Sequence, residues 1–133
     1  MGARASSKFQ VTHWEEEPFD EVGGGAPRLT RASVTKVFRG ELEGDGTVTY
    51  LMVHRTDGTA SFTGIERVIG RLAGKTGTFV LEHNGTYENG TAKATCRVVA
   101  GSGTGDLAGL QGQGTFEADG REAPFEMEYE LGG

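Results

Sequence analysis

The segment Phe125-Glu126-Met127-Glu128-Tyr129-Glu130-Leu131 carries the clearest secondary-structure signal in this chain of 133 residues. Apolar side chains alternate with glutamates, and a period of two places the two sets on opposite faces of a β-strand. A strand with one apolar and one charged face is typical of an antiparallel sheet that covers a core. We therefore expect an antiparallel strand here, with Phe125 and Met127 in the core.

Seven earlier segments repeat this alternation, and none shows a sustained helical period. In the first of them, which opens with Phe9 and Val11, the phase shifts near Trp14. With the last segment they predict eight strands. In the six segments between, the residues that share a face are Ala32, Val34 and Phe38; Val48, Tyr50, Met52 and His54; Phe62, Glu66, Val68 and Leu72; Phe79, Leu81, His83 and Tyr87; Ala92, Ala94, Cys96 and Val98; and Leu110, Gly112, Gly114 and Phe116.

Glycine-containing turns separate most of these segments. Asn-Gly and Asp-Gly pairs are strong hairpin signals, because these residues tolerate a positive φ. One connection is longer, over residues 16–28, and contains Gly23-Gly24-Gly25. The other expected turns are Glu43–Gly46, Asp57-Gly58, Ala73–Lys75, Asn89-Gly90 and Asp119-Gly120.

Eight short antiparallel strands at a spacing of about 12 residues predict an all-β fold, a closed eight-stranded antiparallel β-barrel. Closure removes unpaired strand edges, and a barrel of this size holds packed side chains or one small ligand. A two-sheet sandwich is the alternative. We expect one domain over residues 1–133, with the barrel over about residues 7–131 and a long loop at residues 16–28.

Composition and charge narrow the classes of function. The net charge of −6 argues against binding to nucleic acid or to an anionic membrane surface. Cys96 is the single cysteine, which excludes an intramolecular disulfide and a cysteine-based zinc site. We see no signal peptide and no apolar run long enough to span a membrane, and we expect a cytoplasmic protein.

Several strands carry aliphatic residues on both faces. Leu51 and Val53 oppose Tyr50 and Met52, and Ile65 and Ile69 oppose another apolar set. A barrel with an aliphatic exterior often packs on a neighbour, so we expect a homo-oligomer. The alternative is that residues 16–28 cover this surface.

Glu66 and His83 are the candidate catalytic residues. Each lies in phase with apolar residues, so both are expected to point into the barrel from consecutive strands. A carboxylate beside an imidazole in an apolar cavity suits general acid–base chemistry. The alternative is a buried pair that serves stability alone, or one linked to Arg31 or Arg97.

An apolar pocket with few polar groups is typical of a small-molecule site, although aromatic residues in a small barrel also form plain core. Residues 103–108 fit a G-x-G-x-x-A pattern, but the glycine-rich sequence that follows cannot form the helix of a dinucleotide site. The three histidines lack metal-ligand spacing, and we expect no metal and no cofactor. The candidate substrate-binding residues are Trp14, Tyr50, His54, Phe62, Phe79 and Tyr87.

Five stretches of the chain carry a family resemblance, which extends over about residues 7–131. The chain resembles a bacterial family known as domain of unknown function 3224, which is placed with the allene oxide cyclase-like barrels. The last stretch is also similar to a glycine-rich signature of plant allene oxide cyclases and dirigent proteins, although Leu107 replaces its aromatic residue. The stretches are Phe9-x-Val11-x-x-Trp14, Leu29–Lys36, Phe62-x-Gly64-x-Glu66-Arg67, Gly77-x-Phe79-Val80-Leu81-x-His83-x-Gly85 and Ser102–Gly112.

The resemblance implies an eight-stranded barrel with a central cavity, and superfamily members that cyclise or isomerise hydrophobic substrates. We therefore expect a cofactor-free cyclase or isomerase that acts on a small hydrophobic substrate. The first alternative is a barrel that binds a small hydrophobic ligand without changing it. The second is a filled barrel that acts through its surface, which would contain no ligand-sized cavity.

Overall fold

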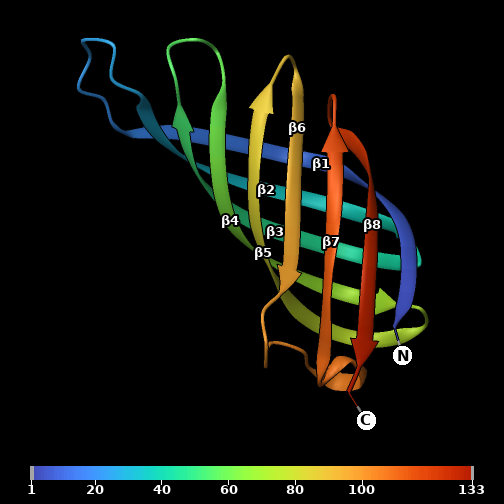
Figure 1. Ribbon diagram of the computed structural model, residues 1–133. Helices are drawn as coiled ribbons and strands as arrows, with labels where there is room; N and C mark the ends of the chain where they lie inside the picture. Colours follow the sequence, from blue (N-terminus) through green and yellow to red (C-terminus); the bar gives the residue numbers. More distant parts are fainter. Residues whose placement is uncertain (1, 133) are drawn as a thin grey trace.

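The computed structural model describes residues 2–132, which form a closed barrel of eight antiparallel strands in sequence order (Figure 1). Each strand pairs with the next, and β8 pairs with β1. The predicted fold class and strand number are confirmed. The elements are β1 (Ala3–Asp20), β2 (Arg28–Gly40), β3 (Leu42–His54), β4 (Ala60–Leu72), β5 (Lys75–Glu88), β6 (Thr91–Val98), the 3-10 helix η1 (Gly105–Leu107), β7 (Leu110–Ala118) and β8 (Glu122–Leu131).

The first connection is shorter than the expected loop over residues 16–28. Strand β1 continues to Asp20 and β2 begins at Arg28, so the loop spans residues 21–27. Beyond Gln10, β1 pairs with β2 but, within the described chain, no longer in register with β8. The outer part of β1 therefore forms a free edge of the sheet, while β2 stays paired with β3 over Arg28–Phe38 (Figure 1). Residues 12–20 of β1 are exposed on both faces, so their sequence lacks the alternation that identifies a half-buried strand.

A β-bulge in β1 explains the phase shift that the sequence indicates. Val11 pairs with Lys36 and His13 pairs with Thr35, so Thr12 is an extra residue in the ladder. An extra residue reverses the faces of all side chains that follow it. As a result Trp14, like Phe9 and Val11, faces the open end of the barrel.

The turn predicted at Glu43–Gly46 is wrong, because β3 already begins at Leu42. Gly44, within this segment, and Gly70 in β4 allow the two strands to pack closely. A side chain at Gly44 would collide with the backbone of Ile69, and one at Gly70 with the backbone of Glu43. Gly44 and Gly70 pair in register, so the backbones of β3 and β4 come close where the sheet bends. The hairpin signals at Asp57-Gly58, Ala73-Gly74, Asn89-Gly90 and Asp119-Gly120 do fall between strands.

The two ends of the barrel differ in how they are filled. The end near η1 is packed with side chains and closed by Leu107, which is fully buried. The loops β1–β2, β3–β4, β5–β6 and β7–β8 surround the opposite end (Figure 1). This opposite end contains the pocket described below. Large side chains of the filled interior include Phe38, Leu42, Leu72, Phe79, Leu81, Leu110 and Phe125.

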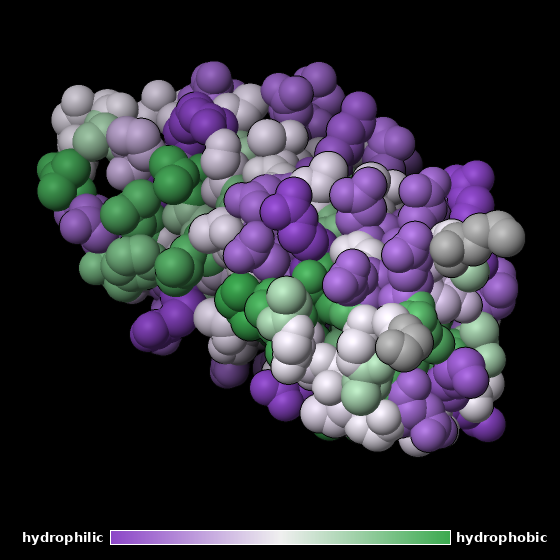
Figure 2. Space-filling view, turned by 60° about the horizontal axis from the view of Figure 1, so that its bottom comes forward, coloured by the Kyte–Doolittle hydropathy of each residue, from purple (hydrophilic) through white to green (hydrophobic). Residues whose placement is uncertain are grey.

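The face of the molecule that Figure 2 shows carries many hydrophilic residues and several apolar patches. Leu51, Ile65 and Ile69 expose 48%, 52% and 56% of their surface on the outer face of β3 and β4. Residues 16–28 do not cover them, since most of that segment forms the outer end of β1 and the loop that joins β1 to β2. Among residues 2–132, no helix is long and apolar enough to cross a membrane.

Candidate functional site

A pocket of about 390 Å³ opens at the end of the barrel opposite η1. Apolar and aromatic side chains form most of its wall, and three turn glycines stand at its mouth. The wall contains two basic side chains, Lys36 and His54, and two carboxylates, Glu16 and Asp119. The lining residues are Phe9, Val11, Trp14, Glu16, Val34, Lys36, Tyr50, Met52, His54, Gly58, Ala60, Phe62, Tyr87, Gly90, Ala92, Phe116, Ala118, Asp119 and Gly120.

Five of the six residues predicted to contact a ligand lie in this wall. They are Trp14, Tyr50, His54, Phe62 and Tyr87. Phe79 is the exception. It lies on the same face of β5 as Tyr87 but eight residues before it, in the filled end of the barrel, and is 1% exposed. Phase along a strand predicts which face a residue occupies, but it does not predict its depth in the barrel.

The two predicted catalytic residues lie beneath the pocket rather than in its wall. Glu66 and His83 are 0% and 1% exposed. They point into the barrel from adjacent strands, as expected, and His83 Nε2 lies 2.7 Å from Glu66 Oε1. Tyr50 and Lys36, which do line the pocket, contact this pair from the pocket side. Lys36 and Tyr50 therefore lie between the pocket and the buried pair Glu66 and His83.

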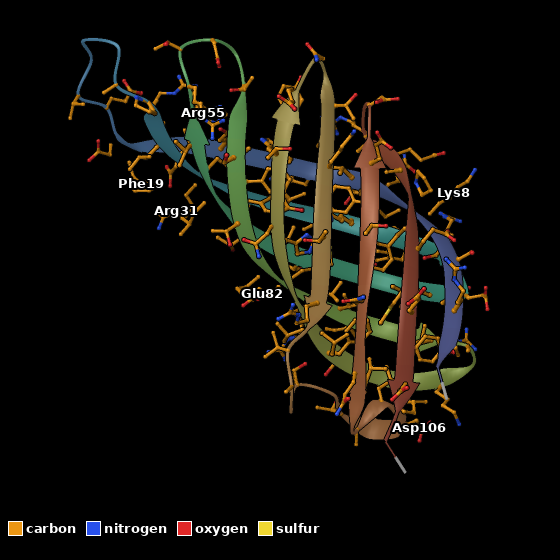
Figure 3. All side chains as sticks on the ribbon, viewed as in Figure 1. Lys8, Phe19, Arg31, Arg55, Glu82 and Asp106 are labelled. Carbon is orange, nitrogen blue, oxygen red and sulfur yellow. The ribbon has the colours of Figure 1, made fainter. Side chains whose placement is uncertain are left out.

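Lys36 is the site residue that the sequence interpretation missed. Its Nζ lies 3.5 Å from Glu66 Oε1 and donates a hydrogen bond to Tyr50 Oη at 3.3 Å. The alternative arginine partners of Glu66 are on the outside: Arg31 points away from the barrel (Figure 3) and pairs with Glu17, and Arg97 is exposed. The signal was available, because Lys36 lies in phase with Val34 and Phe38, as Glu66 does with its own apolar neighbours.

The hydrogen bonds define the protonation of the cluster. Glu66 is a carboxylate, so His83 donates its Nε2–H to Glu66 Oε1. His83 Nδ1 is then an acceptor, and the Tyr50 hydroxyl at 3.5 Å and the Cys96 thiol at 3.4 Å both approach it. Burial lowers the pKa of His83, and the nearby Lys36 ammonium lowers it further, against the opposing effect of Glu66. The imidazole is therefore neutral.

The lysine and the glutamate hold each other in the charged form. Burial alone raises the pKa of Glu66, but Lys36 and the hydrogen bond from His83 outweigh it and the pKa is lowered. Burial alone lowers the pKa of Lys36, but the Glu66 charge and Tyr50 outweigh it and the pKa is raised. Burial raises the pKa of Tyr50 to about 12, so the phenol stays protonated. The pocket floor thus presents an ammonium and a neutral phenol.

A glycine in β3 makes room for the buried carboxylate. A side chain at Gly46 would collide with Glu66 Oε2 and with the Phe38 ring. Within residues 2–132 this Oε2 has no hydrogen-bond partner, and His83 and Lys36 both contact the other oxygen, Oε1. The position of the carboxylate therefore depends on the absence of a Cβ at Gly46.

A second polar cluster lies at the pocket mouth. Glu16 Oε1 accepts a hydrogen bond from Trp14 Nε1 at 3.0 Å. Glu16 Oε2 accepts one from Thr30 Oγ1 at 2.7 Å and lies 2.7 Å from His54 Nε2. Burial raises the pKa of Glu16, but these hydrogen bonds outweigh it and the pKa is lowered. The cluster fixes the Trp14 indole, whose ring lies 6.2 Å from that of Tyr50. No group of three His, Cys, Asp or Glu residues in the described chain could hold a metal ion.

Comparison with known proteins gives a family and a solved relative. The model of a family described as "Protein of unknown function (DUF3224)" matches residues 5–131. A crystal structure of a DUF3224 family protein of unknown function from Shewanella oneidensis MR-1 is 28% identical, covers 100% of both chains and has a TM-score of 0.81. No curated protein matches the chain. The chain belongs to the DUF3224 family.

Proposed function

We propose that the barrel binds a small hydrophobic molecule in the pocket above Lys36. The observation that carries this proposal is an apolar and aromatic pocket of about 390 Å³ with a buried ammonium at its floor. Small-molecule sites are typically concave, mostly apolar and supplied with a few polar groups that orient the ligand. A filled barrel, the alternative without a ligand, would not contain this volume.

In this proposal Glu66 and His83 are positioning residues. Removing a charge from water costs several kcal/mol, so an unpaired lysine at the floor would lose its proton. Glu66 keeps the Lys36 ammonium charged and fixes its position, and His83 orients the Glu66 carboxylate. The roles of acid and base expected for these two residues would require direct contact with a ligand, which their burial opposes.

The test uses the single tryptophan of the chain, Trp14, which lines the pocket. N-phenyl-1-naphthylamine is a neutral apolar fluorophore that accepts energy from tryptophan. We expect energy transfer from Trp14 on binding, with saturation at one probe per barrel. Without saturable binding the proposal is wrong.

A matched pair of variants locates the probe. Ala92→Phe places a ring in the pocket, whereas Thr95→Phe places the same ring on the exposed face of the same strand β6. We expect the first variant to weaken binding strongly and the second to leave it unchanged. Equal binding by both variants would place the probe outside the pocket.

A second candidate function is isomerisation or cyclisation of the bound molecule. What supports it is that Lys36 and the Glu16–His54 pair line one pocket. An ammonium can stabilise an oxygen that gains negative charge, while a rim base accepts a proton from carbon. The test is deuterium exchange in D₂O at the methyl group of 2-acetylnaphthalene, followed by NMR. Catalysis is supported if the protein accelerates the exchange and the His54→Gln variant loses this acceleration. Exchange at the rate seen without protein contradicts it.

We also propose that a second copy of the chain covers the outer face of β3 and β4. The exposed Leu51, Ile65 and Ile69 support this proposal. Light scattering coupled to size-exclusion chromatography tests it. An oligomer that Ile65→Lys dissociates is expected, and a monomer in the unsubstituted protein would contradict it.

A further inference from the structure

The hydrogen-bond donors at the pocket floor are not all used. The Lys36 ammonium has three N–H groups, and its polar partners within the described residues are Glu66 Oε1 and Tyr50 Oη. Its Nζ lies 4.2 Å from the centre of the Phe9 ring and 5.0 Å from that of Phe116, and both rings line the pocket. One N–H thus faces aromatic rings at the pocket floor, where an oxygen acceptor would be a stronger partner.

The floor offers no acceptor in return. An ammonium has no lone pair to share. The Tyr50 oxygen already accepts from Lys36, and its proton is directed at His83 Nδ1. A ligand hydroxyl at this position would therefore bring a proton that has no partner, which is costly in a buried site. A group that only accepts hydrogen bonds fits the floor better.

The charges around the pocket disfavour an anionic ligand. Glu66 already balances the Lys36 charge beneath the floor. Glu16 and Asp119 stand in the wall near the mouth, where an entering anion would meet them. A carboxylate at the floor would add a buried negative charge without a counter-charge of its own.

We propose that the pocket takes a neutral hydrophobic carbonyl compound, with its carbonyl oxygen bonded to Lys36 Nζ. This inference rests on the proposed function, because it needs a ligand in the pocket. It adds the chemical class of that ligand, a ketone, aldehyde or similar neutral acceptor joined to an apolar body. The apolar body lies among the aromatic residues above the floor.

Four probes with the same naphthalene body test the ligand class. They are 2-acetylnaphthalene, its alkene isostere 2-isopropenylnaphthalene, the alcohol 1-(2-naphthyl)ethanol and the anion 2-naphthoate. Quenching of Trp14 gives the four affinities. We expect the ketone to bind about tenfold or more tightly than each of the others, since a hydrogen bond to a charged donor has this effect.

Infrared spectroscopy of the bound ketone reports the hydrogen bond itself. We expect its carbonyl stretch to move to lower wavenumber on binding. The double variant Lys36→Met/Glu66→Gln removes both buried charges together, and should bind ketone and alkene equally without that shift. The same substitutions at the exposed pair Lys93–Glu117, Lys93→Met/Glu117→Gln, form the control and should change neither measurement.

The outcomes separate this inference from the proposed function. Equal binding of ketone and alkene to the unsubstituted protein overturns the carbonyl preference and leaves the pocket as a ligand site. Tightest binding of the alcohol or of naphthoate also overturns it. If none of the four probes binds up to its solubility limit while N-phenyl-1-naphthylamine binds, the inference fails alone. If N-phenyl-1-naphthylamine does not bind either, the ligand-binding proposal fails with it.

Discussion

The Lys36 ammonium lies 3.5 Å from the Glu66 carboxylate, with the two side chains 2% and 0% exposed. This pair separates the open pocket from the filled end of the barrel. On the pocket side it presents an N–H, and on the other side it is anchored by His83. The chemistry at the pocket floor therefore depends on residues that a ligand does not touch.

Breaking the buried ion pair from one side destabilises the protein. Lys36→Met leaves the Glu66 charge without its counter-charge, and we expect a loss of about 3–5 kcal/mol in the free energy of unfolding. The double variant Lys36→Met/Glu66→Gln should lose less than the sum of the two single losses. Urea denaturation measures the coupling. At the exposed pair Lys93–Glu117 we expect at most about 1 kcal/mol. Equal couplings at the two pairs would contradict the account.

Stability falls with acid in two stages. The pKa of His83 is lowered from 6.5, so the unfolded chain takes up a proton that the folded chain resists, and stability falls as the pH drops below 6.5. The pKa of Glu66 is lowered from 4.5, so its contribution is lost below that pH. Urea denaturation across this range measures both stages. We expect His83→Gln to remove the first stage and keep the second; an unchanged profile would show that His83 is not responsible.

Gly46 is the glycine whose substitution acts on the cluster. In Gly46→Ala the new Cβ meets the Glu66 carboxylate and the Phe38 ring, and we expect about 1–3 kcal/mol of destabilisation. Gly120→Ala is the control, because a Cβ there would have no atom within 4 Å. Thermal unfolding of the two variants compares them. A similar midpoint for both would mean that the carboxylate moves aside freely.

Cys96 should be unreactive in the folded protein. It is 2% exposed, and burial raises the pKa of its thiol to about 12, so almost no thiolate exists at neutral pH. We expect Ellman's reagent to react with Cys96 at the rate of unfolding, and rapidly in urea. Fast labelling of the native protein would contradict the burial of this end of the cluster.

The alternation of the sequence predicted much of this structure. Eight strands, the inward faces of Glu66 and His83, and the pocket positions of four predicted residues follow from a period of two; the four are Tyr50, His54, Phe62 and Tyr87. Trp14 faces the pocket because the bulge at Thr12 shifts that period. The pattern did not predict depth, which is why Phe79 was expected in the pocket but lies in the filled end. Depth depends on the stagger of neighbouring strands in the barrel, which local alternation does not contain.

Two other features were beyond a search for apolar patterns. The outer part of β1, over residues 12–20, is exposed on both faces, so Glu16 was expected in a loop rather than on a strand, where it contacts His54. Lys36 was overlooked, although it is a charged residue in phase with an apolar face. A charge in such a position requires a buried partner of opposite sign, and Glu66 is the other charge that meets this condition.

The most direct test of the ligand pocket is a crystal structure of the protein soaked with 2-acetylnaphthalene. We predict that the naphthalene body lies among Trp14, Phe62 and Phe116, and that the carbonyl oxygen lies within hydrogen-bond distance of Lys36 Nζ. Density for the probe outside the barrel, with the pocket closed by its own side chains, would contradict the account.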